Sequence, residues 1–345
     1  MAAHVARRCY SALLAFALVA LFCTTVQARE IVDMAGHRVE VPDKVSRVYG
    51  ASPPDQWLLY AIDPKLIAAR HNSQPDSPLL PYSLDKLPVI TGFVRSTPVN
   101  IEAIVNLKPD SILLWEESPN NENFLKTMAA AHVPVLMMKH RTHEDIIAGL
   151  RLIGTLTGNE ARARALTDYA ETSAREIRAA VDSIPQDRKS AVYLNDNADN
   201  GLDSRCDTSM HAEILKFAGA RVVPECKTES IIVNAQLSFE QLLAYDPDVI
   251  LTSSPVFLQS AKSDPRWKLL KTVRNGRVYL MPRTPLTWIS RPPSFMRILG
   301  AKWVASLLYP DRYKPDMVKE TQAFYRLFLK IEINDGQARE ILQGK

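Results

Sequence analysis

Two stretches far apart in the chain carry the same order of polar and hydrophobic positions. Val99–Trp115 reads VNIEAIVNLKPDSILLW, and Gln236–Ser253 reads QLSFEQLLAYDPDVILTS. In each, a helix-capping residue (Asn100 or Ser238) precedes a short helix with an apolar face, followed by Pro-Asp and a run of Ile, Leu and Val. The cap starts the helix, proline ends it, and a continuous apolar run is typical of a strand buried on both faces. The repeat predicts matching units in two similar lobes, with a ligand cleft between them.

Strand-like and helix-like segments alternate along both halves, which is typical of parallel sheets covered by helices. The candidate strands of the first half are Arg47–Gly50, Leu66–Ala69, Pro88–Thr91, Ser111–Trp115 and Pro134–Lys139, and its candidate helices are Asp55–Ala61, Ile101–Leu107 and Asn123–Ala131. The second half has candidate strands Ser190–Asn195, Arg221–Val223, Asp248–Ser253 and Arg277–Met281, with helices at Ser209–Ala218 and Phe239–Ala244. Before both sets, Glu30–Pro42 has the pattern of a small hairpin. We therefore expect an α/β fold of two Rossmann-like lobes, each built on a central parallel sheet.

One amphipathic helix is predicted between the two sets, from Thr157 to Ile184. Small or apolar residues recur there at steps of three and four, with Arg and Glu on the other face: Leu166, Ala170, Ser173, Ile177, Ala180 and Ile184. At 1.5 Å per residue this helix would be about 40 Å long, and Pro185 would end it. A helix that joins two lobes in this way would let the cleft close only slightly; the alternative is a surface helix of one large domain. The expected division is 1–28 (signal peptide), 29–154 (N-terminal lobe), 155–185 (connecting backbone helix) and 186–345 (C-terminal lobe).

The first 28 residues have the pattern of a secretory signal peptide. Arg7 and Arg8 precede an apolar core at Ala12–Phe22, and small residues allow cleavage after Ala28. The core is too short to span a bilayer, and we expect a periplasmic protein. A lipoprotein would instead use Cys23, although the bulky Phe22 before it fits that alternative poorly.

The charge of the chain is close to balanced. Without residues 1–28 it has 40 Lys and Arg against 38 Asp and Glu, and it carries no long basic run, which argues against nucleic acid as a partner. The mature chain retains Cys206 and Cys226, for which a disulfide is the default in an oxidising compartment and a metal or catalytic role is the alternative.

The order of motifs resembles one known family. An Asp-x-x-Gly-His hairpin is followed by Asn-x-Glu-x-Ile-x-x-Leu-Lys-Pro-Asp, the long helix, the second Glu…Pro-Asp copy, Asn-Gly-Arg-Val-Tyr and Arg291-Pro292. This chain is similar to the periplasmic substrate-binding proteins of ABC importers for ferric siderophores, vitamin B12 and haem, the kind with a single helical backbone. The resemblance implies capture of a metal chelate, most simply a ferric siderophore, without a cofactor of its own, by a monomer that delivers it to an ABC permease dimer. It also implies that Glu102 and Glu240 dock onto permease arginines, whereas a first-turn acid is also favoured by the helix amides alone.

Candidate ligand contacts lie in loops after the predicted strands, where α/β sheets bind ligands. The list combines cationic and aromatic side chains: Arg70, Phe93, Arg95, Trp115, His140, Arg141, Arg205, Trp288 and Arg291. The resemblance favours Trp288 and Arg291, since the family places an aromatic residue and an arginine in this last loop. Guanidinium groups pair with catecholate, carboxylate or oxyanion oxygens, so an anionic metal complex fits better than a bare cation. For each residue a solvated surface position is the alternative, and for Trp115 a position in the core.

Other readings of the same residues have less support. His140, His143 and Asp145 could form a metal cluster, but Thr142 and Asp145 fit a helix N-cap better, so we predict no metal site. His211 is a weaker ligand candidate, before a helix start that could offer free amides to an anion. An oxyanion such as molybdate or tungstate, a corrinoid or haem are the alternative ligands. An exported hydrolase is a remote alternative, because the sequence carries no nucleophile or phosphate-loop motif, and we expect no enzyme activity.

Overall fold

The computed structural model describes residues 28–71, 77–90, 99–118, 121–196, 198–228 and 234–344. The predicted hairpin is present as β1 (Ala28–Val32) paired antiparallel with β2 (Arg38–Pro42). The Asp33 side chain holds its turn, because Oδ1 accepts hydrogen bonds from the backbone N–H groups of Ala35 (2.9 Å) and His37 (2.8 Å). Its Oδ2 accepts the N–H of Met137 (2.9 Å), which attaches the hairpin to the first sheet.

Among the described residues, the first sheet contains three parallel strands in the order β3-β4-β5. They are β3 (Val48–Gly50), β4 (Ser111–Trp115) and β5 (Val135–Met138). Its helices are α2 (Pro53–Ile62), α3 (Ile101–Leu107), α4 (Asn121–Ala130) and α5 (His143–Thr157), with the 3-10 turn η1 at Pro64–Leu66. All five residues of β4 are buried, which confirms that its apolar run is a strand covered on both faces.

Two of the strands predicted for the first half are wrong. The Leu66–Ala69 segment forms a single bridge, between Ile67 and Val48. The predicted strand Pro88–Thr91, which the structure describes as far as Ile90, forms a single bridge, between Val89 and Arg70. The prolines explain why neither ladder extends. Pro64 begins η1, which takes up Leu66, the first residue of the Leu66–Ala69 segment. Pro88 has no N–H to donate, so only its carbonyl oxygen takes part, as acceptor for the N–H of Arg70.

In the part of the chain that the structure describes, the second sheet has six strands in the order β11-β10-β6-β7-β9, with β8 also paired to β6. The strands are β6 (Ala191–Asn195), β7 (Asp203–Arg205), β8 (Arg221–Val223), β9 (Asn234–Gln236), β10 (Val249–Thr252) and β11 (Val278–Leu280). The helices and 3-10 turns of this part are η2 (Gln186–Arg188), α7 (Glu213–Phe217), α8 (Phe239–Tyr245), α9 (Pro255–Ser263), η3 (Pro265–Leu269) and α10 (Lys271–Arg274). β6, β8, β10 and β11 are parallel, as expected of this half.

The sequence did not predict β7 and β9, which pair antiparallel with their neighbours. Their residues, DSR and NAQ, are polar and show no strand periodicity, so only the partner strands reveal them. The helix expected at Ser209–Ala218 is also shorter, since Ser209–Ala212 form turns and α7 begins at Glu213.

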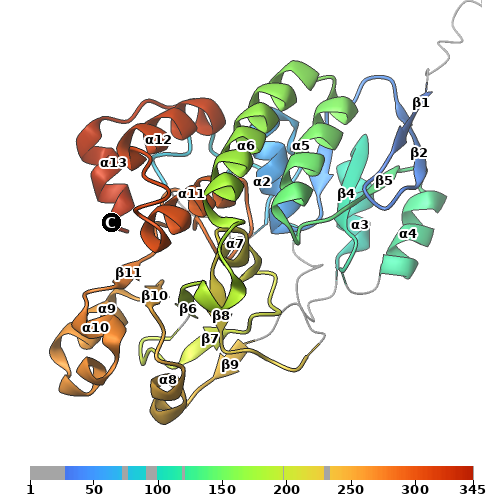
Figure 1. Ribbon diagram of the computed structural model, residues 1–345. Coiled ribbons are helices and arrows are strands. Elements are labelled where there is room, and N and C mark those ends of the chain that lie inside the picture. Colours follow the sequence, from blue (N-terminus) through green and yellow to red (C-terminus); the bar gives the residue numbers. More distant parts are fainter. Residues whose placement is uncertain are drawn as a thin grey trace, which may run out of the picture.

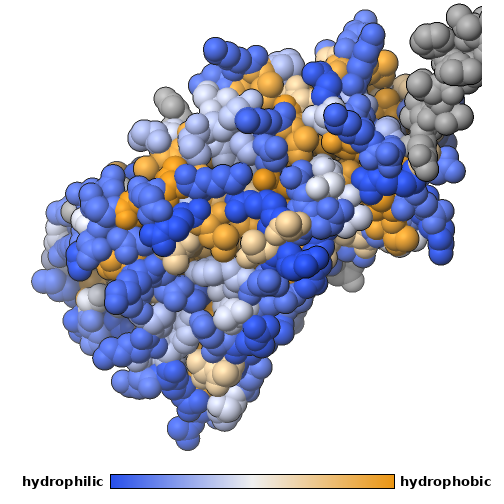
Figure 2. Space-filling model, turned by 90° about the horizontal axis from the view of Figure 1, so that it is seen from above, coloured by the Kyte–Doolittle hydropathy of each residue, from blue (hydrophilic) through white to orange (hydrophobic). Residues whose placement is uncertain are grey.

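The long helix between the sheets is α6 (Glu160–Val181). It is shorter than predicted, because Gly158 ends α5 in a left-handed conformation (φ 68°) and separates the two helices. Its 22 residues make it about 33 Å long. The predicted apolar stripe is confirmed at its centre, where Leu166, Ala170 and Ile177 are buried. Figure 1 shows α6 beside α5, against which it packs. The face of the molecule seen from above in Figure 2 is mostly hydrophilic.

The chain ends in a helical segment that packs against α6. It consists of α11 (Met296–Leu308), α12 (Met317–Phe324), the π-helical η4 (Tyr325–Leu329) and α13 (Asp335–Leu342). One hydrophobic cluster runs through both halves, from Leu58 and Leu150 through Leu166 to Val192 and Leu299. The two lobes therefore share a continuous core around α5, α6 and α11, while each sheet has its own smaller core on the other side. Within the described residues, no helix has the length and apolarity that crossing a bilayer requires.

Candidate functional site

The carboxyl ends of the first-sheet strands carry a buried group of polar residues, which we call the first-lobe group: Ser52, Asp55, His71 and His140. Ser52 caps α2, and the Asp55 carboxylate accepts a hydrogen bond from the backbone N–H of Ser52, so local sequence fixes Asp55 in the first turn. Asp55 Oδ1 lies 2.6 Å from His140 Nε2, and both side chains are almost fully buried. His71 Nε2 lies 3.0 Å from the carbonyl oxygen of Gly50. Burial lowers the pKa of His71, so this imidazole is held neutral.

Gly50 allows α2 to start close to the sheet. A Cβ at this position would lie 2.7 Å from the backbone nitrogen of Gln56. The side chain of Gln56 accepts the N–H of His71 at 2.9 Å, which fixes the loop that follows Ala69. The close approach of strand and helix therefore positions the whole first-lobe group.

The first-lobe ligand candidates have different surroundings. His140 is paired with Asp55 and lies edge-on to Trp115 at 6.2 Å between ring centroids. His140 and Trp115 are both buried by protein contacts (3% and 6% exposed), and their ligand contacts stay predictions. Arg141 is exposed and pairs with Glu117 (Nε to Oε1, 2.8 Å). Arg70 is half-buried, and its Nε has no hydrogen-bond partner within the described ranges, so a ligand oxygen could satisfy it. Phe93 and Arg95 lie outside the described residues.

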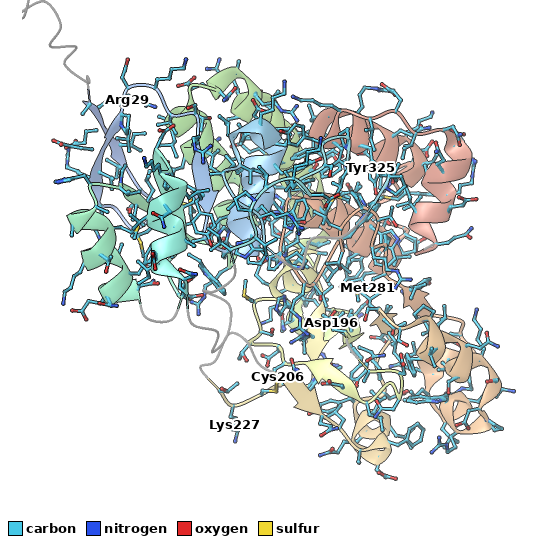
Figure 3. The ribbon with its side chains drawn as sticks, turned by 180° about the vertical axis from the view of Figure 1, so that it is seen from behind. Arg29, Asp196, Cys206, Lys227, Met281 and Tyr325 are labelled. Carbon is cyan, nitrogen blue, oxygen red and sulfur yellow. A yellow bond between two sulfur atoms is a disulfide. The ribbon has the colours of Figure 1, made fainter. Side chains whose placement is uncertain are left out.

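A second polar group lies at the carboxyl end of β6, and we call it the second-lobe group: Asp196, Arg205, His211, Ser290 and Arg291. Asp196 Oδ2 accepts two hydrogen bonds from Arg205, from Nε at 2.8 Å and from Nη2 at 2.6 Å. Its Oδ1 accepts the Ser290 hydroxyl, and Arg291 Nε lies 3.9 Å from Oδ2. Figure 3 places Asp196 toward the middle of the molecule. One carboxylate thus joins β7 and the loop before α11 to the end of β6.

The second-lobe group has a positive electrostatic environment. The pKa of His211 is lowered first by burial and then by the charges of Arg205, Arg297 and Arg291. The Nδ1 atom of His211 is buried without a hydrogen-bond partner among the described residues. Asp196 pairs with Arg205 and Glu213 pairs with Arg297, so three guanidinium groups face two carboxylates around one neutral imidazole. The remaining positive charge favours an anion over a cation at this place.

The two arginines of this group are not equivalent. The Arg205 side chain is 1% exposed and pairs with Asp196 and with the side-chain oxygen of Asn234, and its ligand contact stays a prediction. The Arg291 side chain is 31% exposed, which leaves it accessible from outside the cluster. The structure therefore brings the two predicted arginines together, one buried and one partly exposed.

Trp288, a predicted ligand contact, is buried. Its side chain has no exposed area and belongs to the main core cluster, and its Nε1 donates to the carbonyl oxygen of Thr284 at 3.4 Å. The Trp288 backbone lies against Gly300 of α11, and the ligand contact of this residue stays a prediction. The loops after the predicted strands contain Asp55, Asp196 and Ser290, but the search for cationic and aromatic side chains did not select these residues. Asp196 could have been found, because it directly follows the apolar run of β6.

Glu102 and Glu240 are placed alike on their helices. Each is exposed in the first turn, after an N-cap whose side chain accepts a backbone N–H: Asn100 from Ala103 (2.9 Å) and Ser238 from Gln241 (3.2 Å). Hydrogen bonding to its own backbone N–H and to Ser238 lowers the pKa of Glu240. Both helices thus present an acidic residue to the outside at matching positions.

The second lobe also contains a disulfide between Cys206 and Cys226, with 5.6 Å between the Cα atoms. It connects the residue after β7 to the segment after β8, and Asp207 Oδ1 accepts the N–H of Cys226 (2.8 Å). The N-cap interpretation of Thr142 and Asp145 is confirmed by a capping box at the start of α5. Among the described residues, no cluster of three or more His, Cys, Asp or Glu is placed to hold a metal ion.

The comparisons with known proteins identify the family. Residues 68–285 match the sequence profile described as periplasmic binding protein, which is more than half of the chain. This chain therefore belongs to the periplasmic binding protein family. An ABC transporter solute-binding protein from Sulfurospirillum deleyianum is 34% identical, with a TM-score of 0.84 over 91% of this chain and 98% of that one.

Two further relatives have named ligands. The molybdate-binding protein MolA of Haemophilus influenzae is 22% identical over 93% of this chain and 96% of its own length, and its molybdate-bound structure gives a TM-score of 0.72. An Fe(3+)-citrate-binding protein of Bacillus subtilis is 26% identical over 56% of this chain and 59% of its own. All three relatives are binding proteins by name, and the chain shares the two-lobed α/β fold of the solved structures.

Proposed function

We propose that this protein is a periplasmic receptor that captures an anionic metal complex, a ferric chelate of the siderophore type, and delivers it to an ABC permease. The observation that carries the proposal is the second-lobe group, in which Arg291 remains partly exposed beside a buried Asp196–Arg205 pair. A guanidinium held by a neighbouring carboxylate is oriented in advance, so little conformational entropy is lost when it pairs with a ligand oxygen.

The first lobe supports the same ligand class. Arg70 offers a buried Nε without a partner among the described residues. Because Arg70 and Arg291 come from different sheets, a ligand held by both would touch the two lobes. Catecholate, hydroxamate and carboxylate oxygens of a ferric chelate are suitable acceptors for both side chains.

A bare oxyanion such as molybdate is the second candidate. It is supported by the similarity to MolA, which extends over 93% of this chain. Guanidinium groups such as that of Arg291 are also usual donors for a tetrahedral oxyanion.

Delivery is assigned to the pair Glu102 and Glu240. Both are exposed in the first turn of their helices, at matching positions in the two lobes. Two acidic residues in equivalent positions suit two cationic sites on a permease dimer, and charge complementarity speeds such an encounter.

Titration calorimetry tests the ligand class. Purified protein should bind a ferric catecholate, a ferric hydroxamate or ferric citrate, or, for the second candidate, molybdate or tungstate. Arg291→Gln should reduce the affinity at least 30-fold, about 2 kcal/mol for a desolvated charge pair. Arg283→Gln is the matched control, since Arg283 is an exposed cation of the same loop, and it should change nothing. Native mass spectrometry of protein isolated from the periplasm identifies the natural ligand. An uncharged, metal-free ligand there would show the proposal to be wrong.

A further inference from the structure

The outer side of the second lobe concentrates positive charge in one segment. Residues 255–277, which form α9, η3 and α10 and end just before β11, contain six cations and one carboxylate: Lys262, Arg266, Lys268, Lys271, Arg274 and Arg277, with Asp264. The formal net charge of the whole 345-residue chain is only +4. This short segment therefore carries charge out of proportion to its length.

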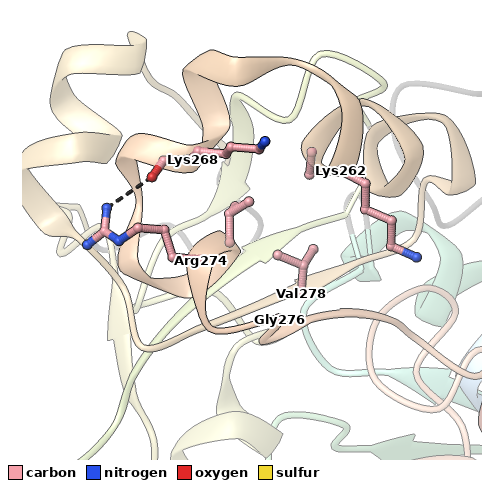
Figure 4. A pocket seen from close by; sticks show the side chains of 7 residues that line it. Lys262, Lys268, Arg274, Gly276 and Val278 are labelled. Carbon is pink, nitrogen blue, oxygen red and sulfur yellow. Dashed lines mark hydrogen bonds between the residues drawn. The ribbon is translucent and has the colours of Figure 1, made fainter.

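Three of these cations surround a surface pocket that we call the basic pocket. Lys262, Lys268 and Arg274 stand at its edge, and Val273 and Val278 supply apolar lining in a volume of about 380 Å³ (Figure 4). Its lining residues belong to α9, η3, α10 and β11, whereas the second-lobe group lies at the end of β6. The pocket is therefore not part of the candidate ligand site.

The pocket cations are available to an external anion. Among the described residues, Lys262, Lys268 and Arg274 form no ion pair with a carboxylate, whereas Arg266 pairs with Asp264 and Lys271 with Asp248. Arg274 Nη1 donates to the carbonyl oxygens of Lys268 (3.0 Å) and Leu269 (2.6 Å), which fixes its guanidinium at the pocket edge. All three side chains are on exposed residues.

Exposed aliphatic residues accompany these charges. Val256 is 59% exposed at the start of α9, and Leu269 is 56% exposed at the end of η3. Cations around a small apolar pocket, with aliphatic side chains on the same segment, match the interface of a membrane. There phosphate groups attract lysine and arginine, and the glycerol and upper acyl region accepts apolar side chains.

Two of the elements that line the pocket, η3 and α10, also contact α8 and the residues after it; α8 carries Glu240, which the proposed function assigns to permease docking. Phe239, which precedes Glu240 on α8, packs edge-on against Trp267 at 5.2 Å between ring centroids. Asp246 and Asp248, which follow α8, both form ion pairs with Lys271 of α10. The elements η3 and α10 lie next to α8. If Glu240 on α8 contacts a membrane-embedded permease, η3 and α10 come close to the surrounding lipid.

We propose that the basic pocket binds the headgroups of acidic phospholipids and holds this flank of the protein against the membrane surface. The position of the pocket beside the docking surface rests on the proposed function, but lipid binding does not require a ligand. The occupant to which we commit is an anionic phospholipid surface, with phosphatidylglycerol as the probe.

Cosedimentation with vesicles tests this proposal. The protein without residues 1–28 should bind phosphatidylcholine vesicles that contain phosphatidylglycerol, should bind pure phosphatidylcholine far less, and should be released by added salt. The double variant Lys262→Gln with Lys268→Gln should bind roughly 25-fold more weakly, at about fivefold per basic residue. Arg274→Lys should retain binding, because it keeps the charge.

The matched control is Lys44→Gln with Lys86→Gln, two exposed lysines of the first lobe, which changes the net charge equally. Equal losses in both double variants would overturn the proposal, since net charge alone would then explain binding. Equal binding to pure phosphatidylcholine, or binding of inorganic phosphate without vesicle binding, would also overturn it. Ligand affinity of Lys262→Gln with Lys268→Gln, measured by calorimetry, should equal that of the wild type. A protein that binds vesicles but no anionic ligand would refute the proposed function and leave the lipid site standing.

Discussion

Asp110 and Asp248 occupy the same position in the two lobes. Each follows the proline that ends a short helix, and each side chain accepts a backbone N–H where the neighbouring strand begins. Asp110 Oδ2 accepts from Arg47 at 2.8 Å, and Asp248 Oδ2 accepts from Ala191 at 2.7 Å. The backbone N–H of each aspartate donates in return to the carbonyl oxygen of the same partner at 2.8 Å. The repeated Pro-Asp therefore fixes the register of β4 beside β3 and of β10 beside β6.

Because the repeat fixes both helices in the same way, Glu102 and Glu240 give the first prediction. The double variant Glu102→Ala with Glu240→Ala should bind ligand as the wild type does, since neither residue belongs to the polar groups, while import falls sharply. Calorimetry beside an uptake assay measures both quantities. Glu122→Ala with Glu160→Ala, which removes exposed first-turn acids of α4 and α6, should import normally. Normal import by the Glu102 and Glu240 variant would leave helix capping as the sole reason for the repeat.

The disulfide gives the second prediction. Cys206 and Cys226 are 20 positions apart, so opening the bridge should lower the free energy of unfolding by about 3 kcal/mol. Cys206→Ala with Cys226→Ala should show this in urea denaturation. Thiol counting on the denatured, unreduced protein without residues 1–28 should find no free thiol, and two free thiols would contradict the pairing.

The third prediction concerns acid stability. His143 is stacked on Phe217 at 4.4 Å, and burial, partly offset by a hydrogen bond to the Ala170 carbonyl, lowers its pKa to about 4. In the unfolded chain the His143 imidazole has a pKa near 6.5, so it binds a proton between about pH 6.5 and 4. In the folded protein the same imidazole stays neutral over this range. Stability should decrease by about 3 kcal/mol as the pH falls through this window.

His143→Phe keeps the stacking and removes the titration. Urea denaturation at several pH values should then show a smaller loss of stability below pH 6.5 than in the wild type. An unchanged pH profile would mean that His143 does not contribute, and His211, whose pKa burial also lowers, would be the next residue to test.

The fourth prediction concerns the attachment of the C-terminal segment. Lys302 on α11 is buried, and its Nζ lies 3.0 Å from Glu176 on α6 and 2.8 Å from Glu320 on α12. Lys302→Met leaves the two carboxylates without their shared cation. Because both carboxylates are partly exposed, we expect the free energy of unfolding to decrease by only about 2 kcal/mol. Chemical denaturation measures it. Adding Glu320→Gln to Lys302→Met should recover part of the loss, and a double variant less stable than the single one would contradict the ion-pair account.

The fifth prediction concerns the N-terminus. Cleavage after Ala28 would make Arg29 the first residue and remove only the first residue of β1. Intact mass measurement of the exported protein should give a chain that starts at Arg29. A lipid-modified chain that starts at Cys23 would support the lipoprotein alternative instead.

Part of the architecture was readable from the sequence because it depends on neighbouring residues. The helix Ile101–Leu107 and the strand Ser111–Trp115 were predicted with their observed bounds, since a capping Asn100, a proline and a continuous apolar run act within a few positions. The disulfide also follows from having two cysteines in the chain without residues 1–28. By contrast, Leu66–Ala69 has the composition of a strand but does not form one.

The tertiary structure alone decided which of these polar side chains are buried in pairs and which stay exposed. His140 pairs with Asp55, 85 positions earlier, and Ser290 reaches Asp196 across 94 positions. Trp288 is buried in the core together with Leu286 and Ile289 of the same loop. No local pattern encodes these outcomes, because the burial of a charge or a ring depends on which distant segments the fold packs around it. The sequence determined the helix caps, the buried parallel strands and the repeated glutamates; the packing of distant segments determined that Arg291 stays partly exposed while Arg205 is buried.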